Sequence, residues 1–298
     1  MAGGGLFLPD TNANQISGWQ WAVSKDLLNA INKPVIVFSV GYNYFPGQQV
    51  SSLFCENIEV LVKKSLFVGL RNRGSVEAIK RLLPDELKEK VVYQPCTTTL
   101  IRRLFKDIPT KKDTQNIAIN IAFDRADRRF GKNKDMILSQ VACFVDKISK
   151  RGYKPIIVYH CTEDNKIKPY LEKISASYDE MNLADTTPDK VFDFYNSVDL
   201  VCGMRGHAQM IPFGLNCEII SLGTHDKMKW FLDDIGCTDW YVDLREDPDG
   251  ICDRLMSTFI RIHEVERERT KKRLLDAQDK LMDITNRNMH IICDILNN

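Results

Sequence analysis

The chain has 298 residues, of which 44% are hydrophobic and 27% charged, a balance typical of a globular protein long enough for two domains. Its 41 basic and 40 acidic residues give a net charge of +1, so any anion site has to come from a local cluster. The N-terminal sequence MAGGGLFLPDTNANQ lacks the features of a signal peptide, and no apolar run reaches the ~20 residues of a membrane span. We therefore expect a cytoplasmic protein that does not bind nucleic acid. Attachment to the inner face of a membrane and assembly into a homo-oligomer stay open.

Several well-known signatures are missing from the sequence. There is no P-loop, no G-x-S-x-G elbow, no H-E-x-x-H and no G-x-G-x-x-G, which argues against an ATPase, an elbow-type hydrolase, a zincin and a simple dehydrogenase. The nine cysteines are scattered, and no two have C-x-x-C spacing. We therefore expect small, buried, reduced cysteines, with no metal and no cofactor.

Apolar, β-rich runs alternate with amphipathic stretches along the chain. The runs predicted as strands are 35–40, 66–70, 91–93, 117–121, 155–159, 198–202 and 218–222. The stretches predicted as helices are 75–83, 134–150 and 188–196, followed by one or two long helices over 248–298. Near-continuous apolar strands that alternate with helices predict an α/β fold with parallel sheets covered on both faces.

A polar segment, KDIPTKKDTQ at 106–115, precedes a fresh strand and predicts a boundary between domains 1–110 and 111–298. The second domain alternates strands and helices in the manner of a nucleotide-binding half, which binds ligands beyond the carboxyl ends of its strands. The first domain has only about three strong strand signals, so we expect it to be a reduced version of the same fold.

The strongest motif lies between 198 and 227. A buried strand, VDLVC, is followed by MRGH (204–207) and the start of a helix. Arg205 offers a planar guanidinium for phosphate or carboxylate, and His207 lies near helix N–H groups that favour anions. Lys227 follows the next strand, EIISL, and adds a cation at the same edge. This pattern predicts an anion site; the alternative is that Arg205 pairs with a surface carboxylate and His207 caps a helix.

A second motif follows the strand 66–70. Arg71 and Arg73 come directly after it, and Ser75 stands where a helix N-cap belongs. We expect Arg71 to point into a cleft between the domains. The alternative is a solvated turn leading into a capped helix.

Two further motifs are weaker. Gly3, Gly4 and Gly5 allow close approach of the backbone to a ligand, the alternative being a frayed terminus. His160 and Asp164 follow the strand 155–159. They are expected to line the same cleft, the alternative being a structural turn.

Together these residues resemble the polysaccharide pyruvyl transferase family over nearly the whole chain. The resemblance rests on GGGLF, PVIVFSVGY, VGLRNRGS, IAINIAFDR, VYHCTED and the segment 199–236, of which the last is the most specific. It implies two Rossmann-like halves of GT-B type with parallel sheets and long C-terminal helices. The N-terminal half, which lacks the early strands of the family, would bind the acceptor, and the C-terminal half the donor.

The resemblance also implies a transferase that moves a pyruvate ketal from phosphoenolpyruvate onto a sugar of a cell-surface polysaccharide or its lipid-linked precursor. The residues that it marks as catalytic are His207 and Arg205. Those that it and the motifs mark as substrate-binding are Arg71, Lys227, Arg73, Gly4, Gly5 and His160. Two alternatives are a GT-B-type glycosyltransferase that uses a nucleotide sugar and a non-catalytic member that binds the donor only. In the catalytic case, Arg205→Ala and His207→Ala are expected to abolish activity and to leave the melting temperature nearly unchanged.

Overall fold

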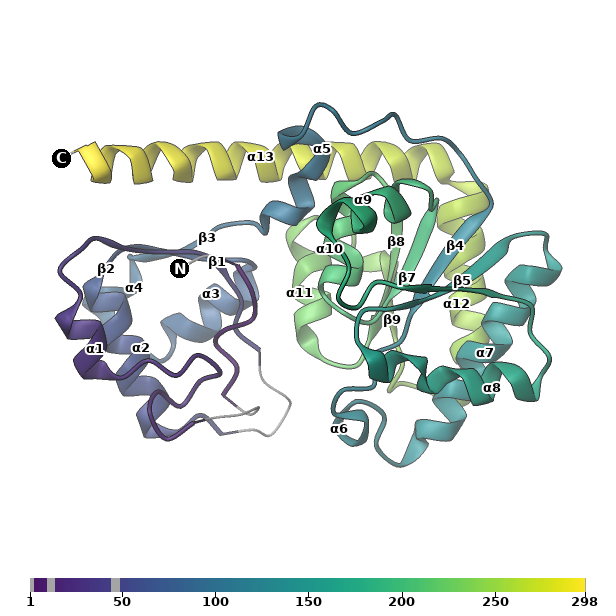
Figure 1. Ribbon diagram of the computed structural model, residues 1–298, viewed down its shortest axis with the longest axis horizontal. Coiled ribbons are helices and arrows are strands. Elements are labelled where there is room, and N and C mark those ends of the chain that lie inside the picture. The colour runs from purple at the N-terminus through teal and green to yellow at the C-terminus, as the bar shows by residue number, and fades with distance from the viewer. Residues whose placement is uncertain (1–2, 10–13, 44–48, 298) are drawn as a thin grey trace. The chain divides into compact units, whose positions relative to one another are not determined.

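The computed structural model describes residues 3–9, 14–43 and 49–297 (Figure 1). The chain forms two compact units: the first is Met1–Thr97 with Lys280–Asn298, and the second is Thr98–Asp279. The division therefore lies before the polar segment 106–115, and the last residues belong to the first unit rather than to the second. The polar segment is a surface connection of the second unit, in which the side chain of Lys111 donates to the carbonyl oxygen of Tyr195 (3.2 Å).

The first unit is built on a small parallel sheet of order β1-β2-β3. Its strands are β1 (Val35–Val40), β2 (Ser65–Leu70) and β3 (Val91–Tyr93), and its shorter helices are α1 (Lys25–Ala30), α2 (Ser52–Lys64), α3 (Arg73–Lys80) and α4 (Asp85–Lys88). Aromatic side chains fill the core, where the rings of Trp19 and Phe54 meet edge to face at 5.8 Å. The β1–β2 register shifts between Val37 and Val40, next to Ser39 with φ +57°.

The second unit has a six-stranded parallel sheet of order β6-β5-β4-β7-β8-β9. Its strands are β4 (Asn116–Asn120), β5 (Lys154–Tyr159), β6 (Asp179–Asn182), β7 (Leu200–Gly203), β8 (Glu218–Gly223) and β9 (Tyr241–Asp243). Its helices include α5 (Ile101–Leu104), α6 (Ala126–Phe130), α7 (Lys134–Lys150), α8 (Lys168–Lys173), α9 (Pro188–Asn196), α10 (His207–Gly214), α11 (Asp226–Asp234) and α12 (Ile251–Phe259). The chain runs outward from β4 in one direction and then from β7 in the other, which is the doubly wound order of nucleotide-binding folds.

All seven predicted strands are present, but the prediction of the second unit was incomplete. It missed β6 and β9, which lie at the two edges of the sheet. β6 has the sequence DEMN, and three of its four residues are exposed. Because this segment has no apolar run, no strand was predicted there.

The C-terminal region is helical, as predicted. After α12, a π-helical turn (Ile260–Val265) leads into α13 (Arg267–Asn297), the long yellow helix of Figure 1. The last part of α13 belongs to the first unit, where Asn288 Nδ2 donates to the carbonyl oxygen of Tyr93 (2.8 Å). Within the described parts of the chain, no helix combines the length and the apolar character needed to cross a membrane.

Candidate functional site

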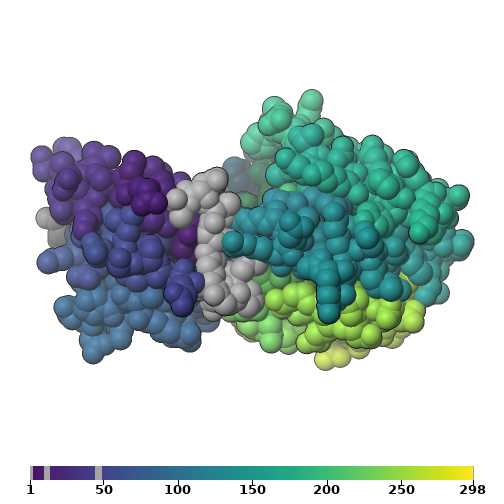
Figure 2. All heavy atoms as spheres, turned by 90° about the horizontal axis from the view of Figure 1, so that it is seen from below, coloured from purple at the N-terminus to yellow at the C-terminus, as the bar shows by residue number. Residues whose placement is uncertain are grey.

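The predicted motif lies at the topological switch point of the second unit. β4 and β7 are neighbours, with Asn120 opposite Gly203, and the chain leaves them toward opposite sides of the sheet. Crevices at such points are where doubly wound sheets bind ligands. The backbone N–H of Arg205 donates to Asn120 Oδ1 (3.3 Å), which ties the MRGH turn to the end of β4. Figure 2 views the second unit from the side of α6 and α8.

Arg205 is held by two carboxylates. Its Nε and Nη2 donate to the two oxygens of Asp164 (2.9 and 2.6 Å), and its Nη1 lies 2.7 Å from Asp124 Oδ1. Burial by itself lowers the pKa of Arg205, but the hydrogen bonds and charge of Asp164, with the charge of Asp124, raise it overall. The alternative for Arg205 was a surface carboxylate; the structure pairs it both with the partly exposed Asp124 and with Asp164, whose side chain is fully buried.

Asp164 organises the connection after β5. Its carboxylate accepts the backbone N–H of His160 (3.1 Å) and the Nδ2 of Asn120 (3.2 Å). It also accepts the N–H of Phe123 (3.4 Å). Asp164 therefore builds the structural turn that was the alternative for this motif and at the same time fixes the guanidinium of Arg205, while the expectation that His160 and Asp164 line a ligand cleft stays a prediction.

A second arginine, which the sequence analysis did not single out, extends this network toward β8. Arg129 donates to Asp124 Oδ2 (2.9 Å) and to Thr224 Oγ1 (3.2 Å). Burial lowers the pKa of Arg129, against the opposing charge of Asp124. Burial raises the pKa of Asp124, but the charges of Arg129 and Arg205 lower it overall. Asp124 is therefore an anion shared by two cations.

His207 and Lys227 lie at the same end of the sheet, beyond the carboxyl ends of β7 and β8. His207 is the first residue of α10, and Gly206 rather than His207 is the N-cap. A Cβ placed on Gly206 would stand 3.9 Å from Lys227 Nζ, so the lysine that follows β8 reaches the turn that follows β7. The structure thus brings Arg205, His207 and Lys227 to one end of neighbouring strands, as predicted from their spacing.

His160 contacts a buried tyrosine. Its Nε2 lies 2.6 Å from the hydroxyl of Tyr195, which is fully buried. Burial lowers the pKa of His160 to about 4, and the charges of Arg205 and His207 act in the same direction. His160 is therefore neutral at pH 7 and offers hydrogen bonds rather than charge.

In the first unit, the side chain of Arg71 is buried against glycines. Arg71 is 3% exposed, its Nη2 lies 3.6 Å from a Cβ placed on Gly5, and a Cβ on Gly41 would stand 2.6 Å from the same atom. Burial lowers the pKa of Arg71. Its Nε has no hydrogen-bond partner among the residues that the structure describes, and no carboxylate among them forms an ion pair with it.

The glycine run is held in place within its described part. Gly3 N–H donates to the carbonyl oxygen of Phe38 (2.8 Å), and Gly41 N–H donates to that of Gly4 (2.9 Å). Gly3 and Gly4 have φ of +70° and +72°, which favours glycine at these positions. The run thus ends beside Arg71 at Gly5, and its close approach to a ligand stays a prediction.

The helix after β2 begins differently from the prediction. Asn72, not Ser75, is the N-cap of α3, and its Oδ1 accepts the N–H of Ser75 (2.7 Å). The Oγ of Ser75 instead bonds to the carbonyl oxygen of Tyr42 (3.3 Å). Arg73 is exposed and stacks on the ring of Tyr93 at 4.9 Å, so of the two arginines only Arg71 is buried.

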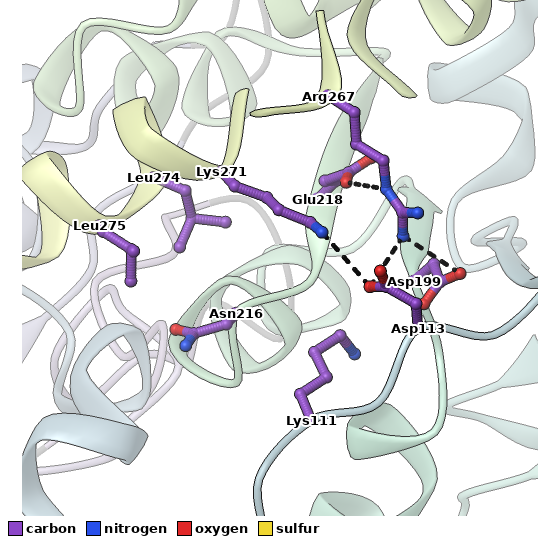
Figure 3. A pocket seen from close by; sticks show the side chains of 9 residues that line it. All are labelled: Lys111, Asp113, Asp199, Asn216, Glu218, Arg267, Lys271, Leu274 and Leu275. Carbon is purple, nitrogen blue, oxygen red and sulfur yellow. Dashed lines mark hydrogen bonds and ion pairs between the residues drawn. The ribbon is translucent and has the colours of Figure 1, made fainter. Parts of the chain in front are cut away.

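A second charged cluster lines a pocket of about 170 Å³ at the opposite end of the strands, where β4, β7 and β8 begin (Figure 3). Arg267 donates to Glu218 (3.1 Å) and lies 3.3 Å from Asp199. His263 Nδ1 lies 2.5 Å from the other oxygen of Glu218. These ion pairs join the start of α13 to Asp199, just before β7, and to Glu218, the first residue of β8.

Comparison with solved structures identifies the fold. A glycosyltransferase from Rickettsia africae matches with a TM-score of 0.54 and 11% identity, over 84% of this chain and 69% of that chain. A UDP-GlcNAc 2-epimerase from Neisseria meningitidis, bound to UDP-GlcNAc, matches with 0.53 and 13%, over 89% and 70%. An α,α-trehalose-phosphate synthase (UDP-forming) from Burkholderia xenovorans matches with 0.53 and 10%, over 91% and 72%. At these identities the likeness shows the fold alone, which is of the GT-B type predicted.

Comparison with sequences identifies the family. A search of curated proteins finds no match. The family model described as polysaccharide pyruvyl transferase matches residues 1–226, which include the glycine run, Arg71, the connection after β5 and the MRGH turn. This confirms the resemblance drawn from those segments: the chain belongs to the polysaccharide pyruvyl transferase family.

Proposed function

We propose that this protein transfers a pyruvate ketal from phosphoenolpyruvate onto a sugar of a cell-surface polysaccharide or of its lipid-linked precursor. The family supports a transferase that acts in polysaccharide synthesis. The observation that carries the anionic donor is the buried Arg71 without a carboxylate partner among the described residues.

The argument from Arg71 is energetic. Removing a charged group from water costs several kcal/mol unless an opposite charge compensates it. Arg71 differs in this respect from Arg205, whose charge is compensated inside the protein by Asp164 and Asp124. A ligand that carries phosphate and carboxylate groups would supply the missing anion, and a guanidinium binds either group through paired hydrogen bonds.

The proposed chemistry needs proton transfer as well as charge. A proton is added to the methylene carbon of phosphoenolpyruvate, one sugar hydroxyl attacks the adjacent carbon, and a second hydroxyl displaces phosphate to close the ketal. The two hydroxyl protons must leave, and a positioned acid–base group typically accelerates such steps by ~10²–10⁴. We assign this role to His207, because burial lowers the pKa of His160 to about 4, which makes His160 a weak base for the hydroxyl protons, and its Nε2 is bonded to Tyr195. Lys227 and the helix N-terminus behind His207 would stabilise the departing phosphate.

The function is tested by following phosphate release from phosphoenolpyruvate in the presence of a panel of sugar acceptors, together with ligand-dependent thermal shifts. We expect a shift with phosphoenolpyruvate and acceptor-dependent release of phosphate. A shift with a nucleotide sugar and none with phosphoenolpyruvate would instead support a glycosyltransferase. A shift with phosphoenolpyruvate and no release with any acceptor would support a family member that only binds the donor.

The sharpest single variant is Arg71→Met, which keeps the apolar stem and removes the buried charge. Because no carboxylate among the described residues compensates that charge, we expect the melting temperature without ligand to stay equal or to rise. We expect the thermal shift with phosphoenolpyruvate to disappear. Arg81→Met, at an exposed arginine that follows α3 in the same unit, is the matched control and should keep the shift. If Arg71→Met retained the shift, Arg71 would not be the residue that binds the donor.

A further inference from the structure

Two cysteines far apart in the sequence meet inside the second unit. Cys143 lies in α7 and Cys252 near the start of α12, and their Sγ atoms are 2.9 Å apart although 109 positions separate them in the chain. Both are free thiols. Cys252 is 3% exposed, whereas Cys143 is partly accessible to solvent.

A lysine stands beside this pair. Lys147 lies one turn after Cys143 in α7, and its Nζ is 2.8 Å from Asp253. Burial and the neighbouring Cys143 raise the pKa of Cys252 to about 12, and the hydrogen bond and charge of Lys147 oppose that rise. The site therefore combines an accessible sulfur, a buried sulfur within reach of it and a cation.

We propose that Cys143 and Cys252 form a reversible oxidation site, at which a peroxide converts the two thiols into a disulfide that joins α7 to α12. The partly accessible Cys143 reacts first: its sulfur attacks one oxygen of hydrogen peroxide, which yields a sulfenic acid and water. The sulfur of Cys252 then attacks the sulfur of Cys143, the S–O bond breaks, and the hydroxyl leaves with the thiol proton as a second water. Two equivalents of a small-molecule thiol reverse the reaction by exchange.

The geometry favours this pair over other partners. A disulfide requires an S–S distance of about 2.0 Å, so the two sulfurs need to approach by less than about 1 Å. The side chain of Gln140 accepts the backbone N–H of Cys252 (3.1 Å), which fixes the start of α12 against α7.

The bond would close a loop that contains most of the second sheet. Residues 143–252 include β5, β6, β7, β8 and β9 and the MRGH turn, while neither sulfur belongs to the network of Arg205. A cross-link over a loop of this length restricts the unfolded chain strongly. We expect the oxidised second unit to melt about 10 °C higher than the reduced one.

The test is to treat the folded protein with hydrogen peroxide, block the remaining thiols with N-ethylmaleimide under denaturing conditions, and map the peptides by mass spectrometry. We expect a cross-linked peptide pair that contains Cys143 and Cys252, lighter by two hydrogens than the separate peptides and restored by dithiothreitol. The rise in melting temperature should accompany it.

Three variants sharpen the test. Cys143→Ser and Cys252→Ser should each abolish the cross-link and the thermal shift, while Cys293→Ser, at an exposed cysteine of α13, should leave both unchanged. Recovery of Cys143 and Cys252 as two N-ethylmaleimide adducts after oxidation would overturn the proposal. So would oxidation of Cys143 to the sulfinic or sulfonic acid without a link to Cys252, or a cross-link that involves Cys293.

Discussion

At the scale of single residues, Arg205 differs from the simplest picture of an anion-binding arginine. All three of its guanidinium nitrogens contact a carboxylate, two with Asp164 and one with Asp124. An incoming anion would have to share this guanidinium with carboxylates already bound to it. We therefore expect Arg205 to shape the switch-point crevice, with direct contact to the donor depending more on His207 and Lys227.

This arrangement changes the expected effect of substitution. Arg205→Ala leaves the buried Asp164 without its cation, and breaking a buried pair in this way typically costs about 3–5 kcal/mol of unfolding free energy. His207→Ala, at a half-buried residue in the first turn of α10, should cost less than about 1 kcal/mol. Urea unfolding of the two variants measures both changes.

A double-mutant cycle isolates the pair. Asp164→Asn removes the opposite charge and keeps the shape, so the loss in Arg205→Ala/Asp164→Asn should be smaller than the sum of the two single losses by more than about 1 kcal/mol. Additive losses would show that Arg205 and Asp164 are not energetically coupled.

The residues of the site could be found from sequence more readily than their partners could. A cation after a buried strand has a visible pattern, and so Arg205, Lys227 and Arg71 stood out. Asp164 was noticed only as a neighbour of His160, because its pairing with Arg205 crosses 41 positions of sequence and arises only when β5 and β7 flank β4. No sequence pattern distinguishes Arg129, because it is one of several arginines in a polar stretch.

At the scale of elements, the strands with the clearest sequence signal include β4, β7 and β8, whose residues are almost all buried. β4, β7 and β8 are apolar runs because helices cover them, whereas the edge strand β9 has only three residues and β6 is polar. A side chain of β9 nonetheless packs against the last residue of β8. The hydroxyl and ring of Tyr241 lie where a side chain on Gly223 would be, at the point where β8 turns toward Lys227.

The contact between β8 and β9 predicts the effect of one added methyl group. Gly223→Ala overlaps the ring of Tyr241, and such overpacking typically costs about 1–3 kcal/mol. Differential scanning calorimetry should therefore show a lower melting temperature for Gly223→Ala. In a chain that already carries Tyr241→Ala, Gly223→Ala should lower the melting temperature by less than it does in the wild-type chain. If Gly223→Ala lowered the melting temperature by the same amount with and without Tyr241→Ala, close packing against Tyr241 would not explain why position 223 is a glycine.

At the scale of the whole molecule, the composition shift at 106–115 marked a surface segment and not the division between units. What decides the division is long-range contact, which composition does not report. α13 is one continuous helix whose last residues complete the first unit: Gln94 Nε2 donates to Thr285 Oγ1 (3.3 Å), and Asn288 Nδ2 donates to Gln94 Oε1 (2.9 Å). Gln94 itself is fully buried.

Removal of Lys280–Asn298 should therefore weaken the first unit selectively. The truncated chain leaves the buried amide of Gln94 without these partners and exposes apolar surface, and both effects cost stability. Hydrogen exchange should show lost protection at backbone amides of β2 and β3 and retained protection at those of β7 and β8. Equal loss in both units would contradict the assignment of this segment to the first unit alone.

The shared helix also has a consequence for the order of folding. The bonds between Gln94 and the last part of α13 join positions 191 and 194 residues apart, so these contacts of the first unit, although most of that unit is synthesised first, can form only after residues 285–288 have been synthesised. Until then the surface that these residues cover in the first unit is exposed. The second unit holds all its strands within one continuous stretch and has no such delay. On the nascent chain, the order of maturation is thus the reverse of the order of synthesis.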